Sequence, residues 1–157
     1  MTRITVHQAR SEDLEPLLDL WQEMMDYHAR LDRRFAPATD GRQVFRPTVT
    51  GWMRDNEWRV LVAVANGQVV GYTIGRVAEV NRVLATPRFG YVTDICVSPQ
   101  WRRQGVGRRL FSTIGAWFRR RGLAAAQLNV AASNPTSQAF WRSMGFGDYM
   151  DRLWLDL

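Results

Sequence analysis

The sequence of 157 residues predicts one mixed α/β domain spanning residues 1–157, and three local patterns support this. A strand-like stretch, 91–97, leads through a loop rich in glycine and arginine into an amphipathic helix at 105–121. Two apolar segments, 58–65 and 68–77, meet at Asn66-Gly67, the strongest two-residue hairpin signal. A second strand-to-helix transition follows at 124–143. We therefore expect one domain that combines strands and helices.

The first 57 residues predict a strand and two helices. Residues 3–7 alternate as a strand does, and Ser11 opens a helix whose early acids and Pro16 suit a helix N-terminus. Its apolar stripe comprises Leu14, Leu17, Leu18, Trp21, Met24, Met25 and His28. An aromatic and charged segment, 26–37, leads into a loop. Residues 46–55 form a second short helix in this prediction.

The remaining elements carry marked turn and cap residues. Gly71 and Gly75, inside the returning hairpin strand, indicate a bulge or a close backbone approach. After the strand at 124–130, Asn134 suits an N-cap, Pro135 the first helical position and Gly145 the C′ position. A closing strand is expected to include Tyr149, Leu153 and Leu155.

Composition narrows the class of protein. No apolar run approaches the roughly 20 residues that span a membrane, and the N-terminus lacks the apolar stretch of a signal peptide. A single cysteine, Cys96, excludes an internal disulfide and favours a reducing compartment. We therefore expect a cytoplasmic protein without a membrane partner.

The net charge of +6 is unevenly distributed. All 21 basic residues are arginine, and no Asp or Glu occurs between Ile95 and Gly147, whereas ten of the fifteen carboxylates precede Trp58. The second half of the chain is therefore expected to meet an anionic partner. For the triplet 119–121, a solvated helix face explains the charge equally well.

The loop at 98–107 has the features of an anion site. Gly105 and Gly107 place no Cβ near a ligand, and a helix start presents free N–H groups at the positive end of its dipole. The Walker motif is absent because Arg108-Arg109 follows Gly107, and the dinucleotide fingerprint is absent because position 110 is Leu.

This stretch resembles the acyl-CoA pyrophosphate loop of the GNAT N-acetyltransferase superfamily, Arg/Gln-x-x-Gly-x-Gly/Ala. Arg102, Gly105 and Gly107 fill its fixed positions. The second half resembles the later motif of the same superfamily, and its matching residues are Asn134, Ala139, Trp141, Gly145 and Phe146. The resemblance covers nearly the whole chain in element order.

The resemblance implies a mostly antiparallel central sheet flanked by helices, with two parallel strands that splay apart to form the acyl-CoA cleft. The pantetheine arm is expected to pair with the backbone of Ile95, Cys96 and Val97. The pyrophosphate is expected on the loop, and Asn134 and Trp141 are expected near the pantetheine end. The loop residues are Arg102, Arg103, Gln104, Gly105, Val106, Gly107 and Arg108.

The implied reaction transfers an acetyl group from acetyl-CoA to a primary amine by direct attack, without a metal. Many relatives have a tyrosine acid where this chain has Trp141, whose N–H is not acidic near neutral pH. Tyr149 is the candidate substitute. The general base is also open, because Tyr91 and Thr93 stand where some relatives have Glu. Asp94 is the only carboxylate on this strand, while a base acting through water, Glu23 or Asp26 are alternatives.

The acceptor is not identified by the sequence. In the superfamily the first helices cover the acceptor end of the cleft, so Trp21, Tyr27 and His28 are candidate substrate-binding residues. Small-molecule amines and a protein N-terminus both fit, and the resemblance implies a homodimer. Two other classes stay open: an acyl-CoA-binding sensor without transferase activity, and a basic nucleic-acid-binding domain, which would not require this glycine spacing.

Overall fold

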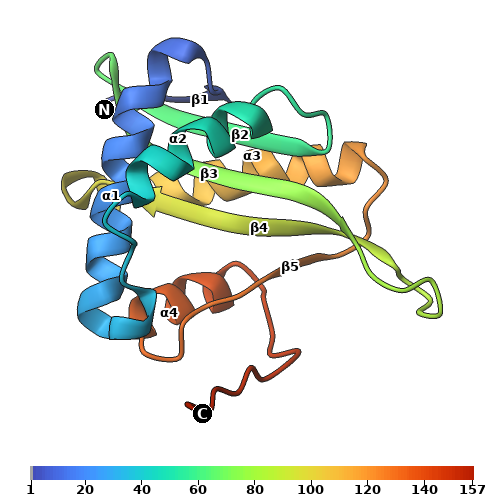
Figure 1. The fold of residues 1–157 in the computed structure, drawn as a ribbon. Helices are drawn as coiled ribbons and strands as arrows, with labels where there is room; N and C mark the ends of the chain where they lie inside the picture. The colour runs from blue at the N-terminus through green and yellow to red at the C-terminus, as the bar shows by residue number, and fades with distance from the viewer. Residues whose placement is uncertain (1) are drawn as a thin grey trace.

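A five-stranded sheet forms the centre of the computed structural model, which describes residues 2–157. The strands are β1 (Ile4–Gln8), β2 (Trp58–Ala65), β3 (Gln68–Glu79), β4 (Arg88–Val97) and β5 (Ala126–Leu128). They lie side by side in chain order (Figure 1). Neighbouring strands are antiparallel except β4 and β5, which are parallel. This mixed, mostly antiparallel sheet confirms the fold expected from the resemblance.

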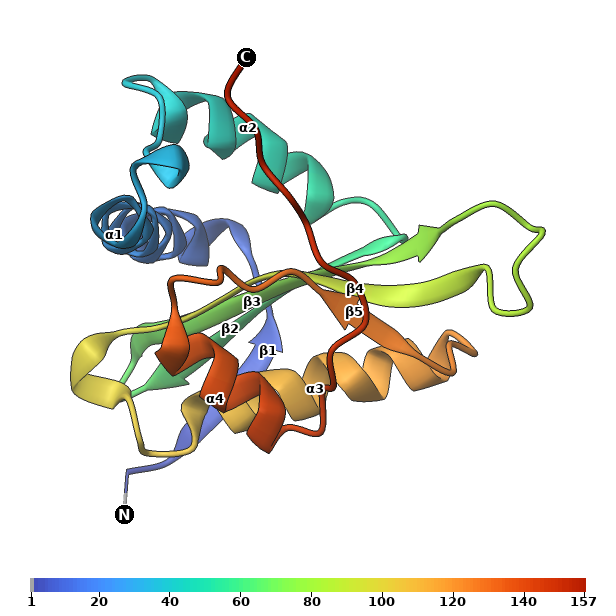
Figure 2. The same cartoon turned by 90° about the horizontal axis from the view of Figure 1, so that it is seen from below.

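Helices cover both faces of the sheet (Figure 2). One face carries α1 (Leu14–Leu31) and α2 (Gly41–Trp52), and the other carries α3 (Val106–Arg120) and α4 (Pro135–Ser143). Three short 3-10 turns, η1 (Ser11–Asp13), η2 (Arg33–Phe35) and η3 (Pro99–Trp101), lie in the connections. Each face buries its own apolar cluster against the sheet. No helix among residues 2–157 is long and apolar enough to cross a membrane.

The hairpin joining β2 and β3 forms as its sequence predicts. Asn66 and Gly67 both have positive φ, 52° and 74°, which is the backbone of the type I′ turn that favours Asn-Gly. On β3, Gly75 lies under α3, where an added Cβ would lie 2.5 Å from Ile114. An added Cβ on Gly90 of β4 would likewise overlap the Phe118 ring. These glycines therefore let α3 pack closely on the sheet, as expected for Gly75.

A bulge in β4 separates the two parallel strands. β5 pairs with β4 only from Gly90 to Val92, and the β3–β4 register shifts immediately afterwards, at Ile74/Gly75. Thr93 is the extra residue, and its hydroxyl donates to the Ile74 carbonyl at 3.1 Å. A bulge bends and twists its strand. Beyond Val92, β4 therefore continues to Val97 without a strand partner on the β5 side, which explains why β5 is shorter than the predicted 124–130.

The second helix begins earlier than predicted, at Gly41 rather than Arg46, and Pro47 lies in its interior. Proline removes one helical hydrogen bond at this position. Aromatic packing compensates, because Phe45 stacks on Trp21 of α1 at 4.5 Å and Trp52 stacks on Trp58 of β2 at 4.1 Å between ring centroids. Packing on α1 and the sheet thus overrides the local preference.

The predicted closing strand is wrong, because residues 147–157 form no helix or strand. Side-chain contacts fix the path of this segment: Arg142 donates to Asp148 at 2.8 Å, and Arg34 of η2 lies 5.6 Å from the Trp154 ring centroid. Tyr149 and Leu153 are consequently 70% and 91% exposed. The segment runs past β5 towards the layer of α1 and α2 (Figure 2).

Candidate active site

The loop between β4 and α3 presents a row of unused backbone donors. Arg103 and Gly105 have positive φ, 62° and 82°, and Gly105 is the N-cap of α3. The first N–H with a helical acceptor is that of Arg109, which donates to the Gly105 carbonyl at 3.0 Å. The N–H groups of residues 103–108 have no backbone acceptor within the part of the chain that the structure describes. Such a row at the positive end of a helix can bind a phosphate group.

The arginines of this loop are divided between structure and solvent. Arg102 folds back, so that its Nε donates to the Val97 carbonyl at 3.0 Å and its guanidinium lies 6.0 Å from the Tyr27 ring centroid. Arg109 donates to the Ile4 carbonyl at 3.3 Å. Arg103 and Arg108 are exposed beside the free N–H groups. Two exposed cations thus remain available to an anionic ligand. Gly107 lets Phe140 of α4 approach the loop.

Next to the loop, the end of β4 offers an unpaired strand edge. Ile95, Cys96 and Val97 pair with β3 on one side, at Thr73, Tyr72 and Gly71, but no strand among residues 2–157 lies on the other side. An extended ligand with amide groups can bind such an edge as an added strand does. The edge and the loop are consecutive in the chain, so one ligand can reach both.

Two predicted site residues from opposite ends of the chain meet at a hydrogen bond. Asn134 is 1% exposed, and its Oδ1 accepts the Ser137 N–H at 3.1 Å as the N-cap of α4. Its Nδ2 lies 3.3 Å from Nε2 of His28, whose Nδ1 lies 3.0 Å from the Met24 carbonyl. Because a carbonyl only accepts, Nδ1 carries the proton and Nε2 accepts from Asn134. This contact joins α1 to the N-terminus of α4.

Asp94 lies on the α1 side of the sheet, opposite Ile74 of β3. Burial raises the pKa of its carboxyl from 3.8 to about 6. The same burial, together with the Asp94 charge, raises the pKa of the Tyr72 hydroxyl, which donates to Sδ of Met24 at 3.8 Å. A carboxylate whose pKa lies near the operating pH can take a proton from an amine.

Cys96 is a packed residue on the same face. Its thiol donates to the Leu20 carbonyl at 3.5 Å, and burial raises its pKa to about 12. The Cys96 side chain is therefore enclosed and does not reach the free edge of β4.

Several predicted residues have other surroundings. Trp141 is 6% exposed, and its ring packs against Phe111, Phe140 and Phe146 between α3 and α4. Trp21 is 8% exposed and stacks on Phe45. Tyr149 lies in the irregular C-terminal segment rather than on a strand beside β4. The rings of the neighbouring residues Tyr27 and His28, by contrast, make an edge contact, with 5.8 Å between ring centroids, and the Arg102 guanidinium lies over the Tyr27 ring.

The sequence interpretation missed a second group on the Asp94 face. Trp58, Arg76 and Tyr91 are direct cross-strand neighbours on β2, β3 and β4. The Arg76 guanidinium lies between the two rings, 5.6 Å from the Trp58 centroid and 5.4 Å from that of Tyr91. The alternation of residue types predicts the strands but not their register, because the bulge at Thr93 decides which residues of β3 and β4 are paired.

Residues 2–157 contain no group of three or more His, Cys, Asp or Glu side chains that could hold a metal ion.

The fold and the loop geometry agree with the comparison to known sequences: the chain belongs to the Acetyltransferase (GNAT) family, which it matches over residues 17–146. It is 31% identical over 101 residues to an aminoglycoside N(6′)-acetyltransferase type 1 of Stenotrophomonas maltophilia, covering 62% of this chain and 65% of that protein. It is 38% identical over 55 residues to the ribosomal protein bS18-alanine N-acetyltransferase of Escherichia coli, covering 35% and 37%. The matched region thus covers less than two thirds of the length of each of these curated relatives.

Solved structures share the fold over almost the full chain. A tetramutant of the BH1408 protein of Bacillus halodurans has a TM-score of 0.84 at 19% identity, covering 98% of this chain and 99% of that one. Aminoglycoside N-acetyltransferase AAC(6′)-Iy, solved in complex with CoA, has a TM-score of 0.77 at 15% identity, covering 100% and 96%. The family and the fold expected from the two motifs are therefore confirmed.

Proposed function

We propose that this protein transfers an acetyl group from acetyl-CoA to a primary amine, both substrates being bound at once. The observation that carries the proposal is the row of free N–H groups at residues 103–108, directly after the unpaired edge of β4. The loop suits the pyrophosphate, and the edge at Ile95–Val97 suits the amide groups of the pantetheine arm. Relatives named N-acetyltransferases, and a structural neighbour in complex with CoA, support this assignment.

In the proposed reaction, the amine nitrogen attacks the thioester carbon. A C–N bond forms, the C–S bond breaks, and the ammonium proton leaves to a base while the thiolate of CoA takes up a proton. Asp94 is the proposed base, acting directly or through one water, because its pKa of about 6 lets it ionise at neutral pH. A backbone N–H at or near Val97 is the proposed donor to the oxyanion.

The structure supplies no side-chain acid in the usual place. Trp141, at the family's tyrosine position, is committed to core packing, and Tyr149 is exposed in an irregular segment. A CoA thiolate is a good leaving group, so in this proposal solvent protonates it. The same observation favours the second candidate function, an acyl-CoA-binding sensor that transfers nothing.

Two measurements test these candidates. Calorimetry with acetyl-CoA reports donor binding, and thiol release with a panel of primary amines reports transfer. Binding with release supports the transferase, and binding without release to any amine supports the sensor. Absence of acetyl-CoA binding contradicts both.

A further inference from the structure

Arg76 stands on the same face of the sheet as Asp94. Trp58 and Tyr91 are its Cα partners on β2 and β4, and Asp94 is the partner of Ile74, two residues before Arg76. Paired residues of adjacent strands share a face, as do residues i and i+2 of one strand. Ile74 and Tyr72 on this face pack against α1 and α2. The guanidinium is therefore on the side from which α1 and α2 cover the sheet, and it is only half-buried.

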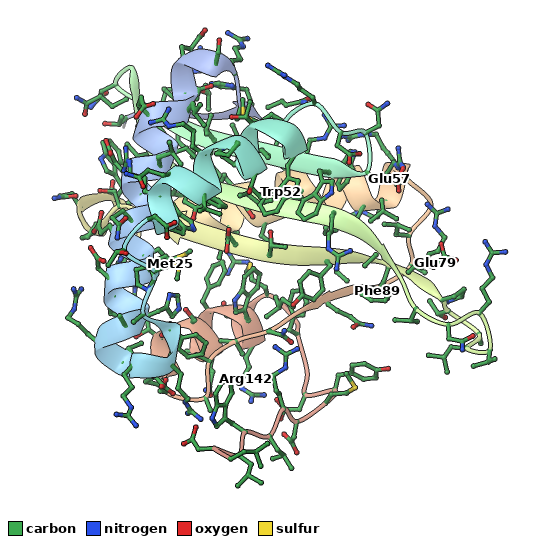
Figure 3. The ribbon with its side chains drawn as sticks, viewed as in Figure 1. Met25, Trp52, Glu57, Glu79, Phe89 and Arg142 are labelled. Atoms are coloured by element: carbon green, nitrogen blue, oxygen red, sulfur yellow. The ribbon has the colours of Figure 1, made fainter. Side chains whose placement is uncertain are left out.

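The carboxylates just before β2 and at the end of β3 are bound to other arginines. Glu57, directly before β2, pairs with Arg121 and with Arg88 at 3.7 Å. Glu79, at the end of β3, pairs with Arg82 at 3.0 Å. Both lie at the far end of the sheet from Met25 of α1 (Figure 3). Within residues 2–157, no carboxylate lies within 4.0 Å of the Arg76 guanidinium.

The two rings fix the cation without neutralising it. The guanidinium lies 5.6 Å and 5.4 Å from the Trp58 and Tyr91 centroids, within the range of cation–π contact. Held in this way, a guanidinium keeps its N–H donors free for a planar anion such as a carboxylate. A positively charged acceptor would instead meet a like charge at this point.

We propose that the acceptor carries a carboxylate, which Arg76 binds while its amine lies beside Asp94. This inference rests on the proposed function, and it names the class of acceptor as a small amino acid-like molecule. Asp94 on β4 is paired with Ile74, two residues before Arg76 on β3, so the backbone positions of the two residues are offset by roughly 7 Å along the strands, and one short molecule can reach both side chains. Base and cation would then fix opposite ends of the same substrate.

The test compares three probes of one chain length: 5-aminopentanoate, its amide 5-aminopentanamide, and 1,5-diaminopentane. Calorimetry in the presence of saturating CoA is expected to show the acid binding at least about tenfold more tightly than the amide, since a charge-assisted bond is lost in the amide. The diamine should bind most weakly. If acid and amide bind equally, the inference is wrong.

The variants separate recognition from packing. Arg76→Gln should abolish the preference for the acid, and Arg76→Lys should keep part of it because the charge remains. Arg82→Gln removes the same charge from the exposed loop after β3 and should change nothing. A preference that survives in Arg76→Gln overturns the inference. Acetyl-CoA binding, measured separately, reports whether the proposed function itself fails, and melting temperatures report any loss of packing around Arg76.

Discussion

The two sides of β4 are built from different parts of the chain. On the proposed donor side, the candidate groups are backbone N–H groups of the loop 98–107 and the free edge of β4, with glycine and helix geometry holding them in place. On the proposed acceptor side, the candidate groups are side chains, Asp94, Arg76 and His28, that come from three elements. A backbone site follows from a short consecutive motif, whereas a side-chain site depends on long-range register.

The largest expected effect breaks the donor side alone. Gly105→Glu places a side chain at φ 82° and a carboxylate among the free N–H groups, so we expect acetyl-CoA affinity to fall by about a hundredfold or more. The fold should survive, because an added Cβ meets nothing within 4 Å and a side chain at positive φ costs only about 1–2 kcal/mol. Gly122→Glu is the matched control, with φ 74° and equally open space at the far end of α3. Calorimetry on both variants measures the effect, and equal affinities contradict the donor assignment.

Asp94→Asn tests the acceptor side. Loss of a general base costs about a hundredfold in kcat/KM, and acetyl-CoA affinity should stay unchanged. In the wild type, kcat/KM should fall as pH drops below about 6, where the carboxyl takes up its proton. That acid limb should be missing from the variant. A wild-type-like profile in Asp94→Asn would exclude this role and turn attention to Glu23 or Asp26.

The same variant has a separate effect on stability. Burial raises the pKa of Asp94 from 3.8 to about 6, so the folded state binds the proton more tightly than the unfolded chain. The stability contributed by the neutral carboxyl is complete below about pH 4 and is lost as pH rises through about 6. In Asp94→Asn this contribution does not change with pH. The melting temperature of the variant minus that of the wild type should therefore increase between about pH 4 and pH 7. A constant difference would show that the pKa of the Asp94 carboxyl is the same in the folded and unfolded chain.

The contact that joins the two sides should contribute less. Asn134→Ala removes the cap of α4 and the bond to His28, and we expect a loss of about 1–2 kcal/mol in the free energy of unfolding. Asn134→Ser keeps a capping hydroxyl but not the His28 contact, so its loss relative to the wild type measures the bridge between α1 and α4, and the further loss in Asn134→Ala measures the cap. Denaturant titration gives both values. Wild-type stability in Asn134→Ser would mean that the bridge adds nothing.

The smallest effect concerns the exposed arginines of the loop. Arg103→Gln should weaken acetyl-CoA binding by only a few-fold, because a solvated charge pair is worth about 1 kcal/mol or less, and the loss should shrink as salt increases. Arg82→Gln serves as the control for net charge. A large loss of affinity that does not depend on salt would instead mean that Arg103, which has a positive φ of 62°, is needed for the loop conformation.

The contrast between the two sides also explains what the sequence could predict. The hairpin, the start of α3 and the cap at Asn134 each depend on a few consecutive residues; the hairpin and the cap formed as predicted, and α3 begins at Val106, one residue after the predicted start, with Gly105 as its N-cap. The early start of α2 depends on packing of Phe45 against Trp21 of α1, a residue well before it in the chain. Asp94 shares a face with Tyr91 and Arg76 because of the β4 bulge at Thr93; Gly75 indicated a bulge or a close approach, but not which residue of the partner strand would be the extra one. The expected closing strand failed because residues 147–157 make side-chain contacts with Arg142 and η2 rather than a ladder.

The burial of Cys96 has a practical consequence for enzymology. The chain has one cysteine, its thiol is enclosed by α1, and its pKa of about 12 leaves almost no thiolate at neutral pH. A disulfide reagent that reports free thiols should therefore give almost no background from the folded protein. Continuous colorimetric recording of CoA release is then possible at high enzyme concentration, which allows even slow acceptors to be ranked.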